Sequence, residues 1–274
     1  MGYMTLTVFS VCIQAAIGMM VFVALGFLWQ KDDTYKTSIS VSAGLGIIGM
    51  LASMMHLGQP FGAVKALNQF STSWLSREIW FTSIFVALVI AAMIFIYMRP
   101  ESRKTIAGLV YASAAVGLVN IFFMAAIYNK SSIPIWQLST TFIEFYMAAI
   151  SLGAILFILI NKQGQLRQIA IIAMVVAVIL QAVSVIPSLI AIGTSGSAAM
   201  QSSLSILHAM YIASVMKWLF ILAGAVLCLW ISRRELAPYS MGIIYGSTAL
   251  LVTGQIVGRY LFYASMVLPR VGLF

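Results

Sequence analysis

Residues 78–98, EIWFTSIFVALVIAAMIFIYM, decide the fold class of this chain. After Glu78 the run holds no charged residue. An α-helix of this length rises about 30 Å at 1.5 Å per residue, which matches the thickness of the hydrocarbon core of a bilayer. Lipid cannot satisfy open backbone N–H and C=O groups, so a run of this kind must be helical. The sequence therefore predicts a membrane-spanning helix here.

Seven further apolar runs have the same character. The composition agrees, because 62% of the residues are hydrophobic and 8% are charged, whereas about a quarter are charged in soluble proteins. The gaps between the runs have room for short interfacial helices but for no soluble domain. We predict an all-α polytopic membrane protein, one domain over residues 1–274, with eight transmembrane helices. The other seven runs cover about residues 6–29, 39–57, 105–128, 142–161, 168–190, 209–232 and 242–262.

The distribution of basic residues predicts the orientation in the membrane. Cytoplasmic loops are enriched in Lys and Arg, so the gaps after the odd-numbered runs are expected in the cytoplasm and both termini outside it. The net charge of +9 follows from this pattern. It also favours the anionic headgroups of the lipid bilayer, and it gives no reason to expect nucleic acid as a partner. The basic residues in those gaps are Lys31, Lys36, Arg99, Arg103, Lys104, Lys162, Arg167, Arg233 and Arg234.

Small and aromatic residues predict further details. The stretch GTSGSAAMQSS, residues 193–203, is small and polar and is expected to form an external loop. Glycines four residues apart, Gly242 with Gly246 and Gly254 with Gly258, would let helices approach closely. Five aromatic residues near the outer ends of the runs are expected to anchor the interface with the lipid headgroups, namely Trp74, Trp80, Tyr128, Trp136 and Tyr263.

Residues 55–80, MHLGQPFGAVKALNQFSTSWLSREIW, place titratable groups at the outer boundary of the bilayer. His56 ends the second run, and Arg77 and Glu78 open the third. Ionisable groups are costly in such a place, so they indicate chemistry by default. The cytoplasmic half of the spans has almost no titratable residue. Three other residues are expected at the same outer end: Glu144 and His208, which open the fifth and seventh runs, and Arg259, in the last turns of the eighth.

A lipid-soluble quinone suits titratable groups that lie on one side of a membrane. Its oxidation releases two protons and two electrons, while its tail stays among apolar helices. A neutral imidazole such as that of His56 is a suitable acceptor for a quinol proton near pH 7. Glu78 would pass the proton on toward water, and Arg259 would stabilise developing negative charge on the quinol oxygen. The pattern therefore favours quinol oxidation at the outer face.

Structural alternatives stand beside each of these roles. His56 would also fit a hydrogen bond to a carbonyl at its helix end. Arg77 and Glu78 would also fit an ion pair at the interface, with Glu78 stabilised in the first turn of a helix. Glu144, like His208, would fit a position at the interface. Arg259 would also fit a structural ion pair with Glu144 or Glu78.

A stand-alone small-solute or proton-coupled transporter is the alternative function. Only the generic eight-span architecture supports it. A proton-coupled transporter should carry a titratable group near the middle of the membrane, with access from both sides. Lys217 and Gln181 are the deepest candidates. Lys217 is expected to extend outward along its four-carbon stem toward the interface.

Three motifs resemble the DmsC family, the membrane anchor subunits of dimethyl-sulfoxide-reductase-type molybdoenzymes. They are HLGQP at 56–60, NQFSTSWLSREI at 68–79 and GRYLFYAS at 258–265. The resemblance covers essentially the whole chain. It implies a subunit of the bacterial inner (cytoplasmic) membrane that oxidises menaquinol. The electrons would pass to an iron–sulfur subunit and on to a molybdopterin catalytic subunit.

The resemblance also implies the site residues. The essential histidine of the family falls on His56 and its important glutamate on Glu78, which gives the two catalytic candidates. No metal ligands are expected. Many relatives carry an arginine where this chain has Gly62, and a lysine nearby would not replace its bidentate fork. The residues expected to bind the menaquinone or menaquinol are His56, Gly58, Pro60, Arg77, Glu78 and Arg259.

Haem is not expected in this chain. A b-type haem in a helical bundle usually takes two axial histidines, and the chain has two in total, His56 and His208. A haem would therefore use every histidine. Transfer without haem requires the quinol to bind close to a cluster in the partner subunit. We expect that partner to dock on the outer face, over the gaps at 58–77 and 129–141.

Overall fold

The computed structural model describes residues 2–29, 34–56, 68–161, 165–232 and 240–268. Within these ranges the chain forms helices and turns and no strand, and eight spans are long and apolar enough to cross a membrane. This confirms the predicted all-α, eight-span architecture. The helices are α1 (Gly2–Trp29), α2 (Lys36–His56), α4 (Trp74–Met98), α5 (Arg103–Asn129), α6 (Thr140–Ile160), α7 (Gln165–Val183), α8 (Val185–Gly193), α9 (Ala198–Ala209), α10 (Tyr211–Ser232) and α11 (Ser240–Ala264), with a 3₁₀ turn, η1 (Pro134–Trp136).

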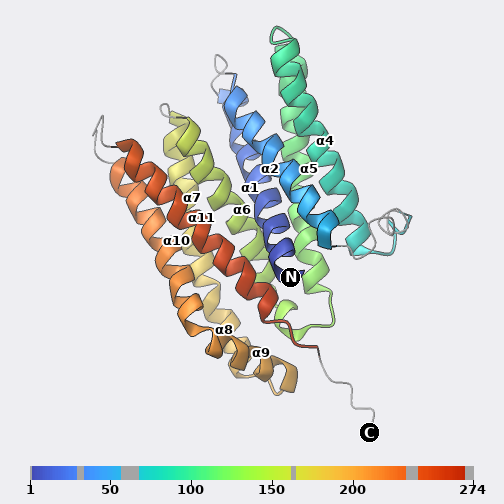
Figure 1. Cartoon of the computed structure of the whole chain (residues 1–274), viewed down its shortest axis with the longest axis vertical. Helices are drawn as coiled ribbons and strands as arrows, with labels where there is room; N and C mark the ends of the chain where they lie inside the picture. Colours follow the sequence, from blue (N-terminus) through green and yellow to red (C-terminus); the bar gives the residue numbers. More distant parts are fainter. Residues whose placement is uncertain (1, 30–33, 57–67, 162–164, 233–239, 269–274) are drawn as a thin grey trace.

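Helix α1 lies at the centre of the bundle. It packs against α2, α5, α6 and α11 and is the most buried span, whereas α10 is the least buried (Figure 1). Two glycines bring α1 and α6 into backbone contact, because a Cβ on Gly18 would lie 1.9 Å from the carbonyl oxygen of Ala149 and one on Gly153 would lie 2.1 Å from Gly18. Helices α4 and α5 form one side of the bundle, and α10 and α11 form the other (Figure 1).

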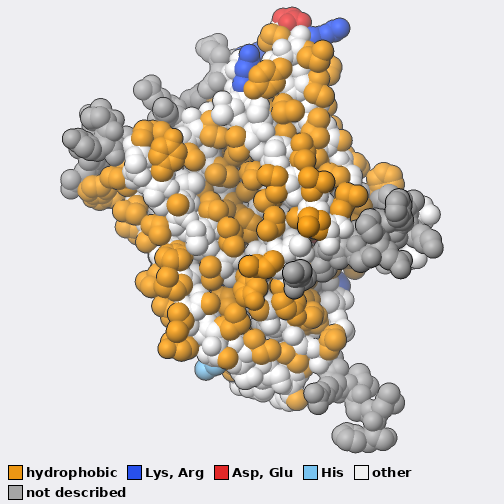
Figure 2. Space-filling model, in the orientation of Figure 1, with side chains coloured by type: hydrophobic (Ala, Val, Ile, Leu, Met, Phe, Trp, Pro, Cys, Tyr) orange, Lys and Arg blue, Asp and Glu red, His pale blue; other side chains and the backbone are white. Residues whose placement is uncertain are grey.

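The two ends of the bundle differ in charge. We name the end at which α1 begins and α11 ends the terminal end (Figure 1). The turn between α4 and α5, with Arg99, Arg103 and Lys104, lies at the opposite end. Figure 2 shows a mainly hydrophobic surface along the helices, with most of its visible charged side chains at that opposite end. The predicted orientation, with the terminal end outside the cytoplasm, stays a prediction.

Helices α4 and α6 begin earlier than expected. Ser73 precedes α4, and its side chain accepts a hydrogen bond from the backbone N–H of Ser76, as an N-cap residue does. Glu78 and Glu144 are therefore each four residues past the start of their helix. Both carboxylates lie about one helical turn deeper than residues that open a span.

The sixth span is broken, and the helix that follows it corrects two expectations. Pro187 has no N–H to donate to the carbonyl of Val183, which is the last residue of α7, and the chain starts again as α8 at Val185. The stretch 193–203, expected as a loop, is largely helical because α9 begins at Ala198. His208, expected to open the seventh span, instead lies in the last turn of α9.

Three of the five predicted interfacial aromatic residues are buried. Tyr128, Trp136 and Tyr263 are 9%, 6% and 1% exposed, so the expectation that they anchor the lipid interface was wrong. They pack together because bundle helices, not lipid, surround this part of the chain. With two phenylalanines they form an aromatic cluster, defined here as Tyr128, Trp136, Phe145, Phe262 and Tyr263.

Candidate functional site

A cavity of about 380 Å³ lies at the terminal end between α1, α2, α4 and α5. We name it the Glu78 cavity. Its walls are mainly apolar and include Leu6 of α1, Met50 of α2 and Ile127 of α5. Trp136 of η1 closes one side. A mainly apolar cavity with a few polar groups is the usual form of a binding site for a small organic molecule.

Glu78 is the acidic residue of this cavity. It is 5% exposed, and its Oε1 has no hydrogen-bond partner among the described residues. Burial without a partner is costly for a polar oxygen, so such an atom calls for a functional explanation. One turn further along α4, Thr82 also lines the cavity, and it exchanges hydrogen bonds with Asn120 of α5 at 2.9 and 3.3 Å. The polar groups beneath Glu78 are thus already paired with each other.

The motif HLGQP lies at the edge of the described residues. Ser53 and Met54 of α2 line the Glu78 cavity, and α2 ends at His56, three residues after Ser53. The backbone end of α2 is thus next to the cavity that contains Glu78. The side chain of His56, and all of Gly58 and Pro60, lie outside the described part of the chain.

Arg77 is directed toward the turn that precedes α4. Its Nε donates to the carbonyl oxygen of Phe70 at 3.0 Å and its Nη2 to that of Ser71 at 2.7 Å. Its guanidinium also lies over the ring of Trp74, 4.4 Å from the centroid. Arg77 is not among the residues that line the Glu78 cavity. These contacts stabilise the approach to α4.

Arg259 is buried on the other side of the aromatic cluster. Its Nη2 donates to the Oε1 atom of Gln14 at 2.9 Å, and its guanidinium lies 3.8 Å from the ring centroid of Phe145. It lines neither the Glu78 cavity nor the second cavity described below. The expected structural partners, Glu78 and Glu144, are not the hydrogen-bond partners seen here. The Gln14 contact was missed, because a glutamine within an apolar run gives no sign of its partner.

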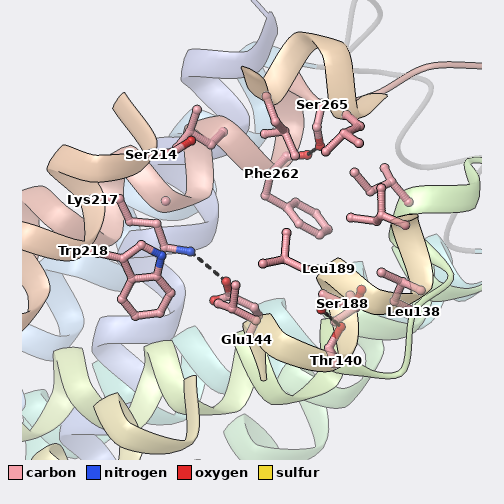
Figure 3. Close-up of a pocket in the computed structure, with 18 of the residues that line it drawn as sticks. Leu138, Thr140, Glu144, Ser188, Leu189, Ser214, Lys217, Trp218, Phe262 and Ser265 are labelled. Carbon is pink, nitrogen blue, oxygen red and sulfur yellow. Dashed lines mark hydrogen bonds and ion pairs between the residues drawn. The ribbon is translucent and has the colours of Figure 1, made fainter. Parts of the chain in front are cut away.

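A second cavity, of about 410 Å³, lies at the terminal end between α6, α8, α9, α10 and α11. We name it the Glu144 cavity. His208 of α9 is part of its wall. Trp218 of α10 also lines it (Figure 3). Its mouth includes exposed apolar side chains such as Leu189, Tyr211 and Val215, which are 56%, 63% and 52% exposed. The cavity is thus open to the apolar surroundings of the bundle.

Glu144 is fully paired, in contrast to Glu78. Its Oε1 accepts from Lys217 Nζ at 2.8 Å, and its Oε2 accepts from Gln181 (Figure 3). Gln181 in turn bonds Gln255 of α11 at 2.9 Å. The expectation that Lys217 extends outward to the interface was therefore wrong, because its ammonium meets an acidic partner inside the bundle.

Glycines explain how Lys217 reaches Glu144. A Cβ on Gly258 would lie 2.8 Å from Lys217 Cε, so the absence of a side chain makes room for the lysine stem. Gly254 likewise lies against the backbone of Lys217. The predicted close approach at this pair is confirmed. The same prediction was wrong for Gly242 and Gly246, where an added Cβ would meet nothing within 4 Å.

Trp136 separates the two cavities and lines both of them. Its indole Nε1 donates to the carbonyl oxygen of Phe262 at 2.8 Å, and its ring stacks on that of Phe262 with a centroid distance of 5.3 Å. Tyr128 meets Trp136 edge-on from the Glu78 side. The aromatic cluster is therefore the wall between the Glu78 cavity and the Glu144 cavity.

The arrangement can bind a flat, apolar molecule and exchange protons with it. Glu78 Oε1 is an available acceptor in an otherwise apolar cavity. Among the described residues no group of three or more His, Cys, Asp or Glu side chains could hold a metal ion. The carboxylate of Glu78 itself offers hydrogen bonding and proton transfer to a molecule in this cavity.

Comparison with known proteins identifies the family. The model of the DMSO reductase anchor subunit (DmsC) matches residues 1–265. The sequence is 28% identical to the YnfH subunit of an anaerobic dimethyl sulfoxide reductase of Escherichia coli, over 94% of its length and 93% of the relative's. It is 26% identical to the C subunit of the same organism's anaerobic dimethyl sulfoxide reductase, over 95% and 92%. With the C subunit of the Haemophilus influenzae enzyme it shares 32% identity over 58% of its length and 60% of the relative's. The protein therefore belongs to the DmsC family and is a multi-pass membrane anchor subunit of a reductase complex, with catalytic and electron-transfer subunits as its partners.

Proposed function

We propose that this chain is the menaquinol-oxidising subunit of its complex and that the Glu78 cavity binds the quinol headgroup. The Oε1 atom of Glu78, buried and without a hydrogen-bond partner among the described residues, carries the proposal. A cavity of about 380 Å³ with apolar walls suits a bicyclic headgroup, and its position among membrane-spanning helices suits an isoprenoid tail. A menaquinol supplies two electrons and two protons when it is oxidised.

Each candidate site residue would have its own role in quinol binding and proton transfer. Glu78 Oε1 would accept a hydrogen bond from one quinol hydroxyl and take its proton. His56, which follows Ser53 by three residues on α2, would be the acceptor at the other hydroxyl. Gly58 and Pro60 would shape the chain after His56. Arg77 would support the turn before α4 rather than touch the headgroup. Arg259 lies behind the aromatic cluster, and its positive charge would raise the electrostatic potential in the Glu78 cavity.

The electrons would leave through the partner subunits. They would pass from the quinol to an iron–sulfur subunit and then to a molybdopterin subunit. That requires the iron–sulfur subunit to dock at the terminal end, close to the Glu78 cavity. The described segment between α5 and α6, residues 130–139, and the turn before α4 lie at this end and would form part of the docking surface. The membrane would be the bacterial inner membrane, with the terminal end outside the cytoplasm.

Quinol oxidation by the assembled complex tests this function. The substitutions are Glu78→Gln, which keeps the shape and removes the carboxylate, and His56→Ala. Loss of a positioned proton acceptor lowers the rate by about 10²-fold or more, so we expect oxidation of a menaquinol analogue to fall by at least that factor in both. Both variants should still assemble with the partner subunits, and co-purification of those subunits measures this.

Glu101→Gln is the matched control, because Glu101 is an exposed carboxylate at the opposite end of the bundle. It should oxidise quinol at the wild-type rate. Normal quinol turnover in Glu78→Gln, in a complex that has assembled, would refute the role of Glu78. The alternative function, a stand-alone transporter, instead requires solute flux in liposomes that contain this protein alone.

A further inference from the structure

We propose that the Glu144 cavity is a second headgroup site, and that it binds a para-quinol in preference to the quinone. The inference rests on the proposed function, because it takes its ligand from the same pool of lipid-soluble quinols. It concerns a different cavity, separated from the Glu78 cavity by Trp136.

The first observation is a hydrogen-bond donor at one side of the cavity. Lys217 Nζ is bonded to Glu144 and lies 4.8 Å from the ring centroid of Trp218. An ammonium has three N–H groups, so donors remain for a ligand oxygen. Figure 3 shows this pair on one side of the cavity and Thr140 with Ser188 on another, and Phe262 and Leu189 are among the other side chains that line it.

The second observation is a hydrogen-bond acceptor at the other side. The hydroxyls of Thr140 and Ser188 lie 2.7 Å apart, and the Ser188 hydroxyl donates to the carbonyl oxygen of Ser184 at 2.9 Å. Ser188 has a single proton, and the carbonyl oxygen of Ser184 can accept it, so we assign the proton between the two hydroxyls to Thr140. Both protons are then committed, and the lone pairs of Thr140 Oγ1 remain available. Thr140 lies one helical turn before Glu144 on α6, so the two polar groups share one face of that helix.

These two sides match the chemistry of a reduced headgroup. A para-quinol carries hydroxyls on opposite edges of a flat ring, and each hydroxyl both donates and accepts. One would accept from Lys217 Nζ and the other would donate to Thr140 Oγ1. A quinone carries two carbonyl oxygens that only accept, so it would satisfy Lys217 but not Thr140. A fatty acid or phospholipid would use one polar side only.

Access and ring contacts support the same ligand. Aromatic side chains of Trp136, Trp218 and Phe262 line the cavity and provide faces for stacking. The exposed apolar residues at the mouth would let an isoprenoid tail extend into lipid. The break between α7 and α8 contributes to this site, because Ser188 follows Pro187 in α8, the helix that begins after the break.

Photolabelling of the full-length protein in lipid nanodiscs tests the proposal. The probe is a naphthoquinone with a diazirine close to the ring and a short prenyl tail, used either oxidised or reduced with dithionite. We expect the reduced probe to label two sets of peptides. One set comes from α4 around Leu75 and Ser83, and the other from α10 between Tyr211 and Trp218. The oxidised probe should label the α10 set several-fold less.

Two variants separate recognition from folding. Lys217→Met combined with Glu144→Gln removes both charges together, and loss of a charged donor should lower labelling of α10 by the reduced probe about tenfold. Thr140→Val removes only the acceptor, and should lower the preference of the α10 set for the reduced probe about fivefold. Thr194→Val is its matched control, because Thr194 bonds the carbonyl oxygen of Ile190 outside the cavity. It should leave the preference unchanged.

The outcomes distinguish this inference from the proposed function. In Glu78→Gln the α4 labelling should fall while the α10 labelling persists. Labelling of α4 alone would overturn the second site and leave the Glu78 site standing. Displacement of the α10 label by a fatty acid of equal tail length, or equal labelling by the oxidised probe, would also overturn it. Absence of both sets would overturn the proposed function as well.

Discussion

The Glu78 cavity and the Glu144 cavity each contain a glutamate at the same position in its helix, but the two carboxylates differ in their hydrogen-bond partners. Each carboxylate is four residues past the start of its helix, at the terminal end of the bundle. The cavities have similar volumes, about 380 and 410 Å³, and share Trp136 as a wall. Glu144 is held by Lys217 and Gln181, whereas Glu78 Oε1 has no partner among the described residues.

The difference shows which carboxylate is available for a reaction. A carboxylate with both oxygens bonded and an ammonium beside it is a poor proton acceptor from a substrate, because its lone pairs and its charge are already satisfied. An unpartnered oxygen in an apolar cavity gains a hydrogen bond only when a ligand brings one. A free energy cost of this kind in the folded protein is typical of functional sites. The comparison therefore assigns the proposed proton transfer to Glu78 and a binding role to the Glu144 cavity.

Breaking the ion pair between Lys217 and Glu144 should have the largest effect on stability. Lys217→Met leaves Glu144 without its ammonium in a largely buried position, and should lower the free energy of unfolding by about 3 kcal/mol. Glu78→Gln removes a carboxylate for which the described residues provide no salt-bridge cation, and should leave the stability equal or higher. Unfolding of the purified protein in micelles, followed by helicity, measures both.

The double variant Lys217→Met with Glu144→Gln is the control for that comparison. It removes the orphaned charge and keeps an amide oxygen for Gln181, so most of the lost stability should return. If Lys217→Met were as stable as the wild type, the ion pair would not hold α10 against α6. If Glu78→Gln were strongly destabilised, Glu78 would have a structural partner and the contrast between the cavities would fail.

A polar pair beneath Glu78 sharpens the comparison. Thr82→Val removes the acceptor of the Asn120 side-chain amide, which is fully buried. Leaving that donor unsatisfied should cost about 2 kcal/mol in the same unfolding measurement. Replacing both residues, Thr82→Val with Asn120→Leu, should recover most of the loss. A loss that persisted in the double variant would mean that packing, not the hydrogen bond, is what Thr82 contributes.

The smallest effect is expected at the shared wall. Trp136→Phe keeps a ring but removes the indole donor to the carbonyl oxygen of Phe262, and should cost about 1 kcal/mol of unfolding free energy. Quinol-analogue binding at both cavities should weaken in this variant. Trp218→Phe is the control, since Trp218 lines only the Glu144 cavity. Weakened binding at the Glu78 cavity in Trp218→Phe would contradict a separating role for Trp136.

Much of the candidate site could be predicted from the sequence, but the side-chain contacts between distant residues could not. The motif at 68–79 and the break at 55–80 directed attention to Glu78, which the structure places in a cavity. Lys217 was expected to extend toward the interface, and Glu144 or Glu78 was the structural partner considered for Arg259, whereas the structure pairs Lys217 with Glu144 and Arg259 with Gln14. The contacts that they make join residues 73 and 245 positions apart, and no local pattern encodes such a pairing.

The sequence by itself determined the class, the number of spans and the family of this protein. Lipid allows only helices for long apolar runs, so the fold class and the number of spans follow from local composition, and short local motifs carry the resemblance to the family. Only the tertiary structure decided which carboxylate is paired. That depends on the rotation of each helix about its axis and on the close approach at Gly258, which lets Lys217 reach Glu144 and leaves Glu78 Oε1 without a described partner.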